Sequence, residues 1–481
     1  MQTQNSKEKK KASKSIKQKP HKTAKQDVRN FHYNKRKIQC IKDYFTKNDN
    51  KNQYFCFYLT NAAETCYGIV LDAGSSGTKV QIYQWPCLRS SQVPHFNLNA
   101  TQSKKFHEPL AHFQGQTHKL KAYFDDIFSY INEKVPFIMR QQTPIILGAT
   151  AGMRLLDQQI QSEIINESKA LLSQQGYYFP QSKQNEWCSI LTGQQEGAYL
   201  WVSVNYLLNM LTFNQNQVTL TVATIELGGA STQIAFLPKT KRIENNQSYD
   251  FDMVINGFND WHIYTYSYLG YGKLKARKNI LLSQNPTSSF IIHSPCFFNG
   301  YEGIQKINDV LYKIKGLGIY SECRQSILNY LDVNKNNCLF QDVKQCAMQN
   351  QYQYLLPAHM VIYASSGIQK AAHLLGFNNQ FILRDFSQKT EQLYSLSWKD
   401  ASLQFQDEED LGNILFLITY VENLLKFGYN IEIDRQIFVP QKINSVSPGW
   451  TLALLMQRVS QLSCRELYGQ ICLELVNDIN Y

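Results

Sequence analysis

Two short turns of small residues, each headed by a carboxylate, are the parts of this 481-residue chain best suited to chemistry. The first is DAGSSGT at 72–78 and the second is ELGGAST at 226–232. An apolar stretch precedes each turn and another strand-like stretch follows it, the pattern of two strands joined by a turn. We therefore expect two similar hairpins, with Asp72 and Glu226 at equivalent positions 154 residues apart.

The paired turns predict a phosphate site. Small residues allow backbone N–H groups to converge on an anion, and turns on two sides would hold a phosphate between them. The leading carboxylates of Asp72 and Glu226 would repel that phosphate. We therefore expect a divalent cation, Mg²⁺ or Ca²⁺, bound to them directly or through water. Thr78 and Gly228 belong to these turns and are counted among the phosphate-binding residues.

Two segments between the turns supply further candidates. Thr150 ends a buried stretch at 144–149 and precedes a helical stretch, so it is placed to contact a phosphate or a metal-bound water. Its alternative role is a simple helix N-cap. Glu196 follows Gly193 in the first turn of an apolar helix, where a carboxylate is also favourable for purely structural reasons. Its functional interpretation is a general base.

The net charge of +11 is concentrated in the first 53 residues, which carry 16 Lys and Arg against four acids. The remaining 428 residues are close to neutral, so charge gives no reason to expect a specific nucleic-acid partner. The Lys- and Gln-rich composition predicts disorder over 1–53. This tail is either a solubilising extension or a polybasic segment that contacts a membrane surface.

Cysteines and glycosylation sequons indicate the compartment. The chain has eleven cysteines without a CxxC pair, and sequons at Asn99, Asn166 and Asn246. We expect a few disulfides and a location in the secretory pathway, extracellular or membrane-associated, although no signal peptide or transmembrane helix is recognised. The apolar stretches 198–213 and 411–427 are expected to be buried helices.

Five segments together resemble the apyrase family, the nucleoside triphosphate diphosphohydrolases, in order and spacing. They are DAGSSGTKVQIYQWP (72–86), ATAGMRLL (149–156), LTGQQEGAYLWVSVNYLL (191–208), IELGGASTQIAF (225–236) and PGWTLALL (448–455). The resemblance implies a hydrolase acting on phosphoric anhydrides, of the apyrase or nucleoside-diphosphatase type. It implies cleavage of the terminal phosphate of nucleoside tri- and diphosphates with Ca²⁺ or Mg²⁺.

The resemblance also implies an α/β fold of two lobes, like actin, hexokinase and Hsp70 (ribonuclease H-like), with the active site in the interlobe cleft. Each lobe is expected to hold a mixed five-stranded sheet. On this basis we expect a tail at 1–53, lobe I at 54–190, lobe II at 191–443 and a return to lobe I at 444–481.

Carried over position by position, the resemblance assigns roles. Glu196 matches the base that activates the attacking water, and Ser231 and Gln233 match residues that position that water. Asp72 matches a carboxylate that holds the water shell of the metal. The residues that match the phosphate-binding tips are Ser75, Ser76, Gly77, Gly229 and Ala230.

The chain departs from the family pattern at a few positions. Glu226 stands where Asp is usual, which lengthens the side chain by one methylene and puts the metal preference in doubt. Lys79 stands where many relatives carry Arg, and Tyr363 is the candidate for stacking on the base. The alternative functions are an exopolyphosphatase-like hydrolase of the same fold and a catalytically impaired nucleotide-binding protein.

Overall fold

The computed structural model describes most of the chain from residue 65 onward and three strands before it. The described residues are 28–33, 36–42, 54–58, 65–87, 94–211, 221–238, 250–253, 261–285, 289–333, 345–463 and 466. The chain forms two compact units, Met1–Glu64 and Thr65–Tyr481. Residues 1–27, which carry much of the predicted basic tail, and the sequon at Asn246 lie outside the described residues.

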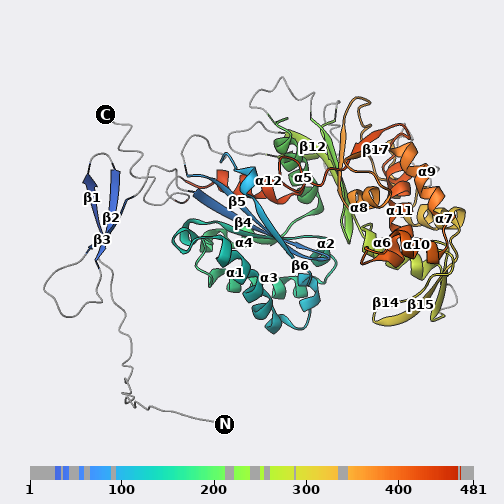
Figure 1. The fold of residues 1–481 in the computed structure, drawn as a ribbon, viewed down its shortest axis with the longest axis horizontal. Helices are drawn as coiled ribbons and strands as arrows, with labels where there is room; N and C mark the ends of the chain where they lie inside the picture. The colour runs from blue at the N-terminus through green and yellow to red at the C-terminus, as the bar shows by residue number, and fades with distance from the viewer. Residues whose placement is uncertain are drawn as a thin grey trace, which may run out of the picture. The chain divides into compact units, whose positions relative to one another are not determined.

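The first unit contains a three-stranded antiparallel sheet in the order β1-β2-β3, formed by Val28–Tyr33, Arg36–Lys42 and Tyr54–Tyr58 (Figure 1). The prediction of disorder over 1–53 is therefore wrong for β1 and β2. The strand-forming residues of this region are concentrated in VRNFHY and RKIQCIK. The Lys- and Gln-rich average over 53 residues concealed these two β-prone segments.

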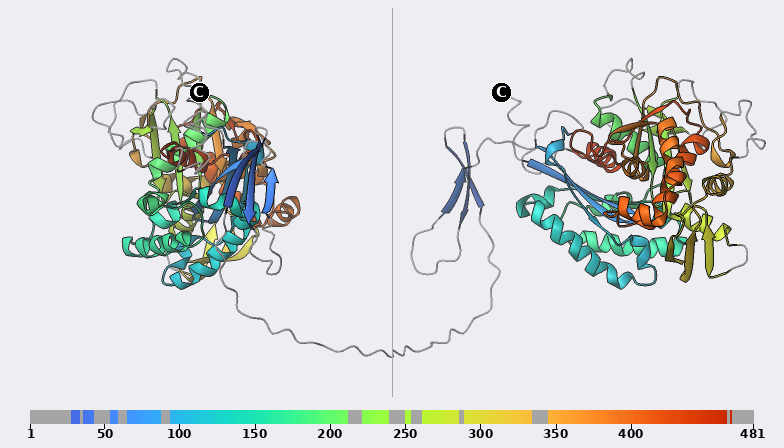
Figure 2. Two further views of the ribbon diagram at one scale, coloured as in Figure 1. Left: turned by 90° about the vertical axis from the view of Figure 1, so that its left-hand side faces the viewer. Right: turned by 45° about the vertical axis from the view of Figure 1, so that its right-hand side comes forward.

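The second unit begins with a five-stranded mixed sheet in the order β6-β5-β4-β7-β8. Ile69, Val70 and Leu71 in β4 are fully buried, as expected for a central strand covered on both faces. α1 (Leu120–Lys134) and α3 (Gln158–Ser173) cover one face, and α12 (Thr451–Ser460) packs on β4 (Figures 1 and 2). The strands are β4 (Thr65–Gly74), β5 (Gly77–Pro86), β6 (Gln102–Phe106), β7 (Ile145–Ala149) and β8 (Cys188–Ile190).

A second mixed sheet has seven strands in the order β11-β12-β10-β9-β16-β18-β17, so the expectation of five strands is wrong for this lobe. The sheet carries the short strands β11 and β17 at its two edges. α8 (Gly367–Leu374) and α11 (Ile414–Asn423) pack together on its outer side. The strands are β9 (Ala223–Leu227), β10 (Ser231–Phe236), β11 (Asp250–Met253), β12 (Trp261–Leu269), β16 (Ile362–Ser366), β17 (Gln380–Ile382) and β18 (Gln436–Phe438).

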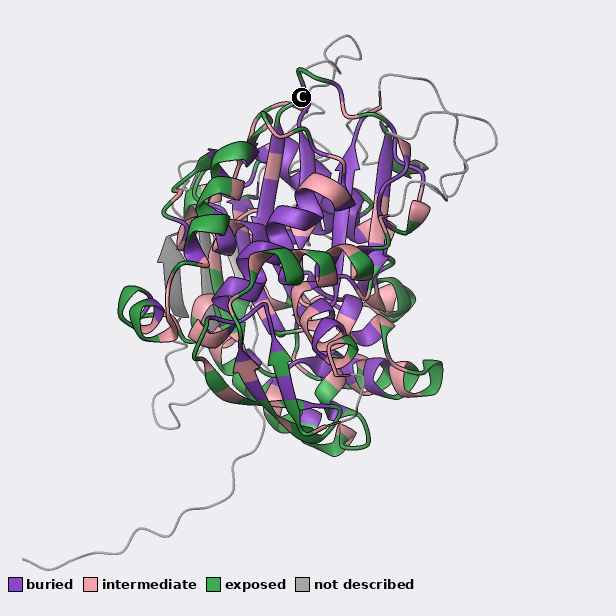
Figure 3. Cartoon of the chain, turned by 90° about the vertical axis from the view of Figure 1, so that its right-hand side faces the viewer, coloured by how far each residue is buried: buried purple, intermediate pink, exposed green. Residues whose placement is uncertain are grey.

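Helix α5 (Gly193–Leu207) connects the cores of the two sheets. It packs against β10 and β12 of the second sheet and against α12, which in turn packs on β4 of the first. Ala198 to Val204 are all buried, which is the pattern of a helix enclosed on every side. Figure 3 shows buried residues concentrated in such central strands and helices. Among the described residues, no helix has the length and apolar character needed to cross a membrane.

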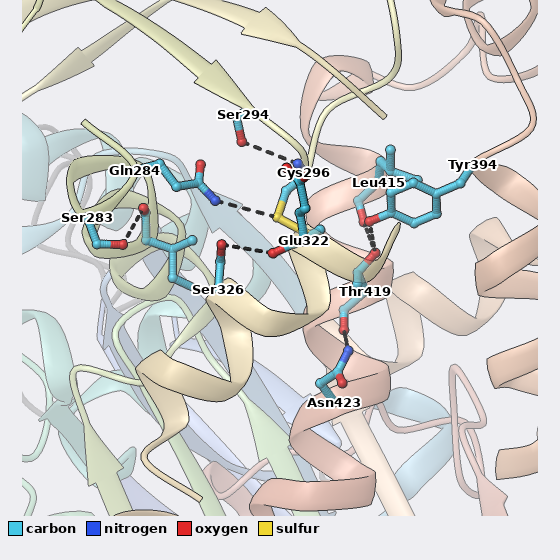
Figure 4. Close-up of a disulfide and its surroundings, with 12 residues drawn as sticks. Ser283, Gln284, Ser294, Cys296, Glu322, Ser326, Tyr394, Leu415, Thr419 and Asn423 are labelled. Atoms are coloured by element: carbon cyan, nitrogen blue, oxygen red, sulfur yellow. Dashed lines mark hydrogen bonds between the residues drawn. A yellow bond between two sulfur atoms is a disulfide. The ribbon is translucent and has the colours of Figure 1, made fainter. Parts of the chain in front are cut away.

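Two disulfides between described cysteines reinforce the second unit. Cys66–Cys87 links the start of β4 to the residue after β5, and Cys296–Cys323 links the segment after β13 (Ile291–Ser294) to α7 (Tyr320–Leu331) (Figure 4). Cys346 is also disulfide-bonded, whereas Cys188 is a buried free thiol. The expectation of a few disulfides is confirmed. A small third sheet has the order β13-β15-β14, with β14 at Glu302–Ile307 and β15 at Val310–Gly316.

The C-terminal helix closes over the first sheet at Gly148. A Cβ atom at Gly148 would lie 2.6 Å from the ring of Trp450, which is only 2% exposed. One residue further on, Thr451 shares a hydrogen bond of 2.9 Å with the hydroxyl of Tyr83 in β5. The absence of a side chain at Gly148 therefore sets how closely the segment at 450–460 approaches the sheet.

Gly148→Ala is expected to destabilise the protein by about 1–3 kcal/mol, because the added methyl group displaces the Trp450 ring from a filled core. Urea denaturation followed by tryptophan fluorescence measures the change. Gly449→Ala is the matched control, since the nearest atom to a Cβ at that position is 4.0 Å away. Equal stability of the two variants would contradict this account of the packing.

Candidate active site

The two predicted hairpins have the same strand register. In the first, Asp72 pairs with Lys79, and in the second Glu226 pairs with Gln233. Each residue of the second pair follows its counterpart by 154 positions, so the repeat seen in the sequence is also a repeat of strand pairing. Each leading strand also has a parallel neighbour, β7 for β4 and β16 for β9.

The tips of the two hairpins lie against each other at Ser75. A Cβ atom at Gly229 would lie 2.4 Å from Ser75 Oγ, and one at Gly152 would lie 3.0 Å from Ser75 Cα. Gly77 has φ of +126°, and a Cβ there would lie 2.1 Å from the carbonyl oxygen of Phe106. Glycine is therefore required at these positions by close approach and backbone conformation.

A cleft of about 330 Å³ lies between the two tips. The predicted residues that line it are Asp72, Ser75, Ser76, Gly77, Thr150, Glu196, Glu226, Gly228, Gly229, Ala230 and Ser231. Thr78 and Gln233 are buried beside this lining rather than part of it. The side chain of Thr150, at the N-cap position of α2 (Ala151–Arg154), makes no capping hydrogen bond, so it does not serve as a side-chain N-cap.

Tyr363 is not brought to this cleft. It lies in β16 and stacks on Phe438 of β18, with ring centroids 5.2 Å apart and planes 15° from parallel. Its role as a base-stacking residue stays a prediction without geometric support from the cleft lining.

Glu196 is held at the inner end of the cleft by the start of α5. A capping box between Thr192 and Gln195 fixes the helix terminus, so Glu196 falls in the first turn as predicted. Glu196 is 6% exposed. Its position therefore depends on a rigid helix end rather than on a surface loop.

Four side chains form one hydrogen-bond network around Glu196. Arg154 Nη2 donates to Glu196 Oε2 at 2.8 Å and to Ser231 Oγ at 3.2 Å. Gln233 Nε2 donates to the same two atoms, at 3.1 Å and 2.6 Å respectively. The Glu196 carboxylate and the Ser231 hydroxyl are therefore fixed relative to each other from two sides.

Carboxylates crowd this end of the cleft, and the charge of a neighbouring carboxylate raises the pKa of two of them. Burial, then the charges of Glu226 and Glu196, raise the pKa of Asp72 to about 8. Burial and the charge of Glu196 raise the pKa of Glu226 to about 7. Burial also raises the pKa of Glu196, although Arg154 opposes this shift. Without a cation, the three groups resist simultaneous ionisation.

Asp72 and Glu226 fit a hard divalent cation. Ser366 Oγ donates to Glu226 Oε1 at 2.7 Å, while the buried Oε2 atom has no hydrogen-bond partner in the described part of the chain. Mutual repulsion and an unpartnered oxygen are features that a bound Mg²⁺ or Ca²⁺ would relieve. No group of three or more His, Cys, Asp or Glu close enough to hold an ion occurs among the described residues. Such an ion would therefore also need water or substrate oxygens as ligands.

Several residues of the cleft were not predicted. Arg154 and Trp450 lie within the family-like segments, but their contacts depend on elements distant in sequence. Ser366 has φ of +58°, unusual for a serine, and no sequence signal marked it. The other charged residues of the cleft lining that carried no assigned role are Lys79, Lys105, Lys273 and Lys370.

Asp72→Asn is expected to reduce the loss of stability with rising pH. The folded-state pKa of about 8 lies above the ordinary value, so the folded protein keeps a proton that the unfolded chain releases. Stability is therefore lost as the pH rises from about 4 to about 8. Calorimetry should give the variant a higher Tm than wild type at pH 8, by about 2 °C, and a smaller difference at pH 5.

Asp126→Asn, on an exposed position of α1, is the control for the loss of one carboxylate. If Asp72→Asn and wild type lost stability in parallel from pH 5 to pH 8, the assigned ionisation of Asp72 would be wrong.

Comparison with known proteins agrees with the motifs. Residues 58–469 match the model of the GDA1/CD39 (nucleoside phosphatase) family. Ectonucleoside triphosphate diphosphohydrolase 1 of Mus musculus is 30% identical over 436 residues, which cover 83% of this chain and 82% of the mouse protein. Ectonucleoside triphosphate diphosphohydrolase 5 of Gallus gallus is 26% identical over 413 residues, which cover 83% and 89% of the two chains.

A solved structure also matches the fold. A crystal structure of nucleoside triphosphate hydrolases from Neospora caninum superposes with a TM-score of 0.58 at 15% identity, over 87% of this chain and 95% of that one. The predicted two-lobed, actin-like α/β fold with a cleft between the lobes is confirmed. The chain belongs to the GDA1/CD39 (nucleoside phosphatase) family and is a hydrolase of phosphoanhydride bonds.

Proposed function

We propose that this enzyme hydrolyses the terminal phosphate of nucleoside di- and triphosphates with a water molecule activated by Glu196 and with a divalent cation. The observation that carries the proposal is the network in which Glu196, Ser231 and Gln233 share hydrogen bonds beside the two glycine-rich tips. The relatives named ectonucleoside triphosphate diphosphohydrolases support the nucleotide as substrate.

The reaction proposed is a direct in-line displacement. Ser231 and Gln233 orient a water molecule towards the terminal phosphorus, and Glu196 accepts its proton as the new O–P bond forms. The bridging P–O bond breaks, and the shortened nucleotide departs with the electron pair. The raised pKa of Glu196 favours this role, because a base is most effective when its pKa approaches the working pH.

The tips of the hairpins bind the phosphate through backbone N–H groups, as small residues at both tips allow. The lining residues concerned are Ser75, Ser76, Gly77, Gly228, Gly229 and Ala230, with the hydroxyl of Thr150 as a further contact. Thr78 is buried beside this lining and stays a predicted contact. Asp72 and Glu226 hold the cation, Mg²⁺ or Ca²⁺, through water. When bound, the cation supplies positive charge to the phosphate oxygens.

Glu226, in place of the usual Asp, is compatible with this role. Its longer side chain is restrained by the Ser366 hydroxyl at Oε1, which leaves Oε2 as the oxygen available to a cation or its water. This arrangement supports an active enzyme over a catalytically impaired nucleotide-binding protein.

The disulfides support an oxidising compartment for this protein. Cys66–Cys87 and Cys296–Cys323 would persist in the secretory pathway or outside the cell. The names of the relatives, which are ectonucleotidases, agree with that location.

A phosphate-release assay with ATP, ADP, GDP and UDP tests the proposal, with Mg²⁺, Ca²⁺ or a chelator. We expect release with either ion and none with the chelator. Glu196→Gln should lower kcat by about 10²–10⁴-fold, because the water loses its base while the hydrogen-bonding shape is kept.

Glu163→Gln, on an exposed position of α3, is the matched control and should behave as wild type. Wild-type turnover by Glu196→Gln would overturn the assignment of the base. Tight nucleotide binding without turnover by the wild-type protein would instead favour a catalytically impaired protein.

Arg154→Gln is expected to move the acidic limb of the kcat/KM–pH profile to higher pH. Arg154 is the cation that lowers the pKa of Glu196, so its removal leaves a buried carboxylate that binds its proton more tightly. Arg154→Lys retains a positive charge and should shift the limb less. An acidic limb that stays in place in Arg154→Gln would contradict this role.

A further inference from the structure

Besides Lys79, which pairs with Asp72 in the first hairpin, three lysines of the cleft have no part in the mechanism above. Lys105 lies in β6 at the edge of the first sheet, Lys273 is the first residue of α6 (Lys273–Ser283), and Lys370 lies in α8. All three line the same cleft as the carboxylates. We call Lys105, Lys273 and Lys370 the lysine row.

Two members of the lysine row are anchored beside the hairpin tips. Lys105 Nζ donates to Ser76 Oγ at 3.1 Å, and the backbone N–H of Lys273 donates to the carbonyl oxygen of Gly228 at 3.0 Å. Lys370 Nζ lies 3.2 Å from Glu408 Oε2, in a pair whose side chains are 40% and 36% exposed. The positive groups therefore belong to the part of the cleft that a phosphate chain at the tips would reach.

The positive charges of the lysine row repel one another, which lowers the pKa of Lys273. Burial, followed by the charges of Lys370 and Lys105, lowers the pKa of Lys273 to about 8, and Asp410 only partly offsets this. Arg277 adds a further positive charge nearby, although it is paired with Asp410 at 3.3 Å. A bound polyanion would relieve this repulsion, as opposite charge favours the charged form of each lysine.

Two lysines of the row also line a small neighbouring cavity. Lys273 and Lys370 line both spaces. The other lining residues of the second cavity are polar or charged (Arg277, Asp410, Asn413) and apolar (Leu274, Leu374, Ile414, Phe416, Leu417). Trp450, the one aromatic residue among the described lining of the main cleft, is 2% exposed and covers Gly148. The two side chains that the main cleft and this cavity share, Lys273 and Lys370, are therefore both cationic.

We propose that the lysine row binds the phosphates that remain on the leaving group, so that the enzyme ranks substrates by the number of their phosphates and also hydrolyses inorganic triphosphate. The proposal rests on the proposed function and names the substrate class of the same site. Water attacks the terminal phosphorus of triphosphate, one bridging P–O bond breaks, and orthophosphate and pyrophosphate form.

The double variant Lys273→Gln/Lys370→Gln tests this proposal with ATP, inorganic triphosphate and ADP. We expect KM to rise about tenfold for ATP and for triphosphate, because charge-assisted bonds to their additional phosphate are lost. KM for ADP should change less than threefold, and kcat should be kept for all three substrates. Lys278→Gln, on the same helix but outside the cleft lining, is the matched control and should resemble wild type.

Binding of inorganic triphosphate to Glu196→Gln, measured by calorimetry, gives a readout independent of turnover. When Lys273→Gln and Lys370→Gln are introduced into the Glu196→Gln variant, triphosphate should bind about tenfold more weakly. Equal losses for ATP and ADP, or wild-type cleavage of ATP but not of inorganic triphosphate, would overturn the proposal. Failure of the proposed function gives a different result, namely no phosphate release by wild type from any nucleotide.

Discussion

Repulsion between carboxylates held close together is the constraint on which the rest of the structure depends. Asp72, Glu196 and Glu226 come from two sheets and one helix, and burial raises the pKa of each. Such a cluster would separate if it were carried on flexible loops. Here it is fixed by paired strands and a capped helix start, and the cost of the crowding is offset by burial elsewhere in two large cores.

The carboxylates are held in place by two hairpins of the same design, one in each sheet. Each sheet contributes a hairpin whose leading strand carries the carboxylate and has a parallel neighbour that ends at the cleft. Helix α5 packs with both halves and adds Glu196 between them. Arg154 and Gln233 then join Glu196 to Ser231, so groups from both lobes share one network. The charge of the cleft is a local property that the nearly neutral body does not reveal.

Local sequence pattern predicted the parts of the site that depend on neighbours in the chain. The two hairpins and the first turn of α5 follow from apolar strand-like stretches, small turn residues and a glycine before an apolar helix, so their residues could be named in advance. Arg154, Ser366 and the lysine row could not be named in advance, because each belongs to the site only through contacts with elements that are distant in sequence. The extra strands of the second sheet were missed because the expected strand number was taken from the family resemblance. The strands β1 and β2 were missed because the average composition of residues 1–53 does not show short β-prone segments.

The packing at Ser75 couples the residue types allowed at three distant positions. One serine at the first tip leaves no space for a side chain at Gly152 or at Gly229, which are 77 residues apart. A larger residue at either glycine would clash with Ser75, and a larger residue at position 75 would clash with the segments that contain Gly152 and Gly229. Divergence of this protein is therefore restricted jointly at these positions, and a tolerated change at one of them would require a compensating change across the cleft.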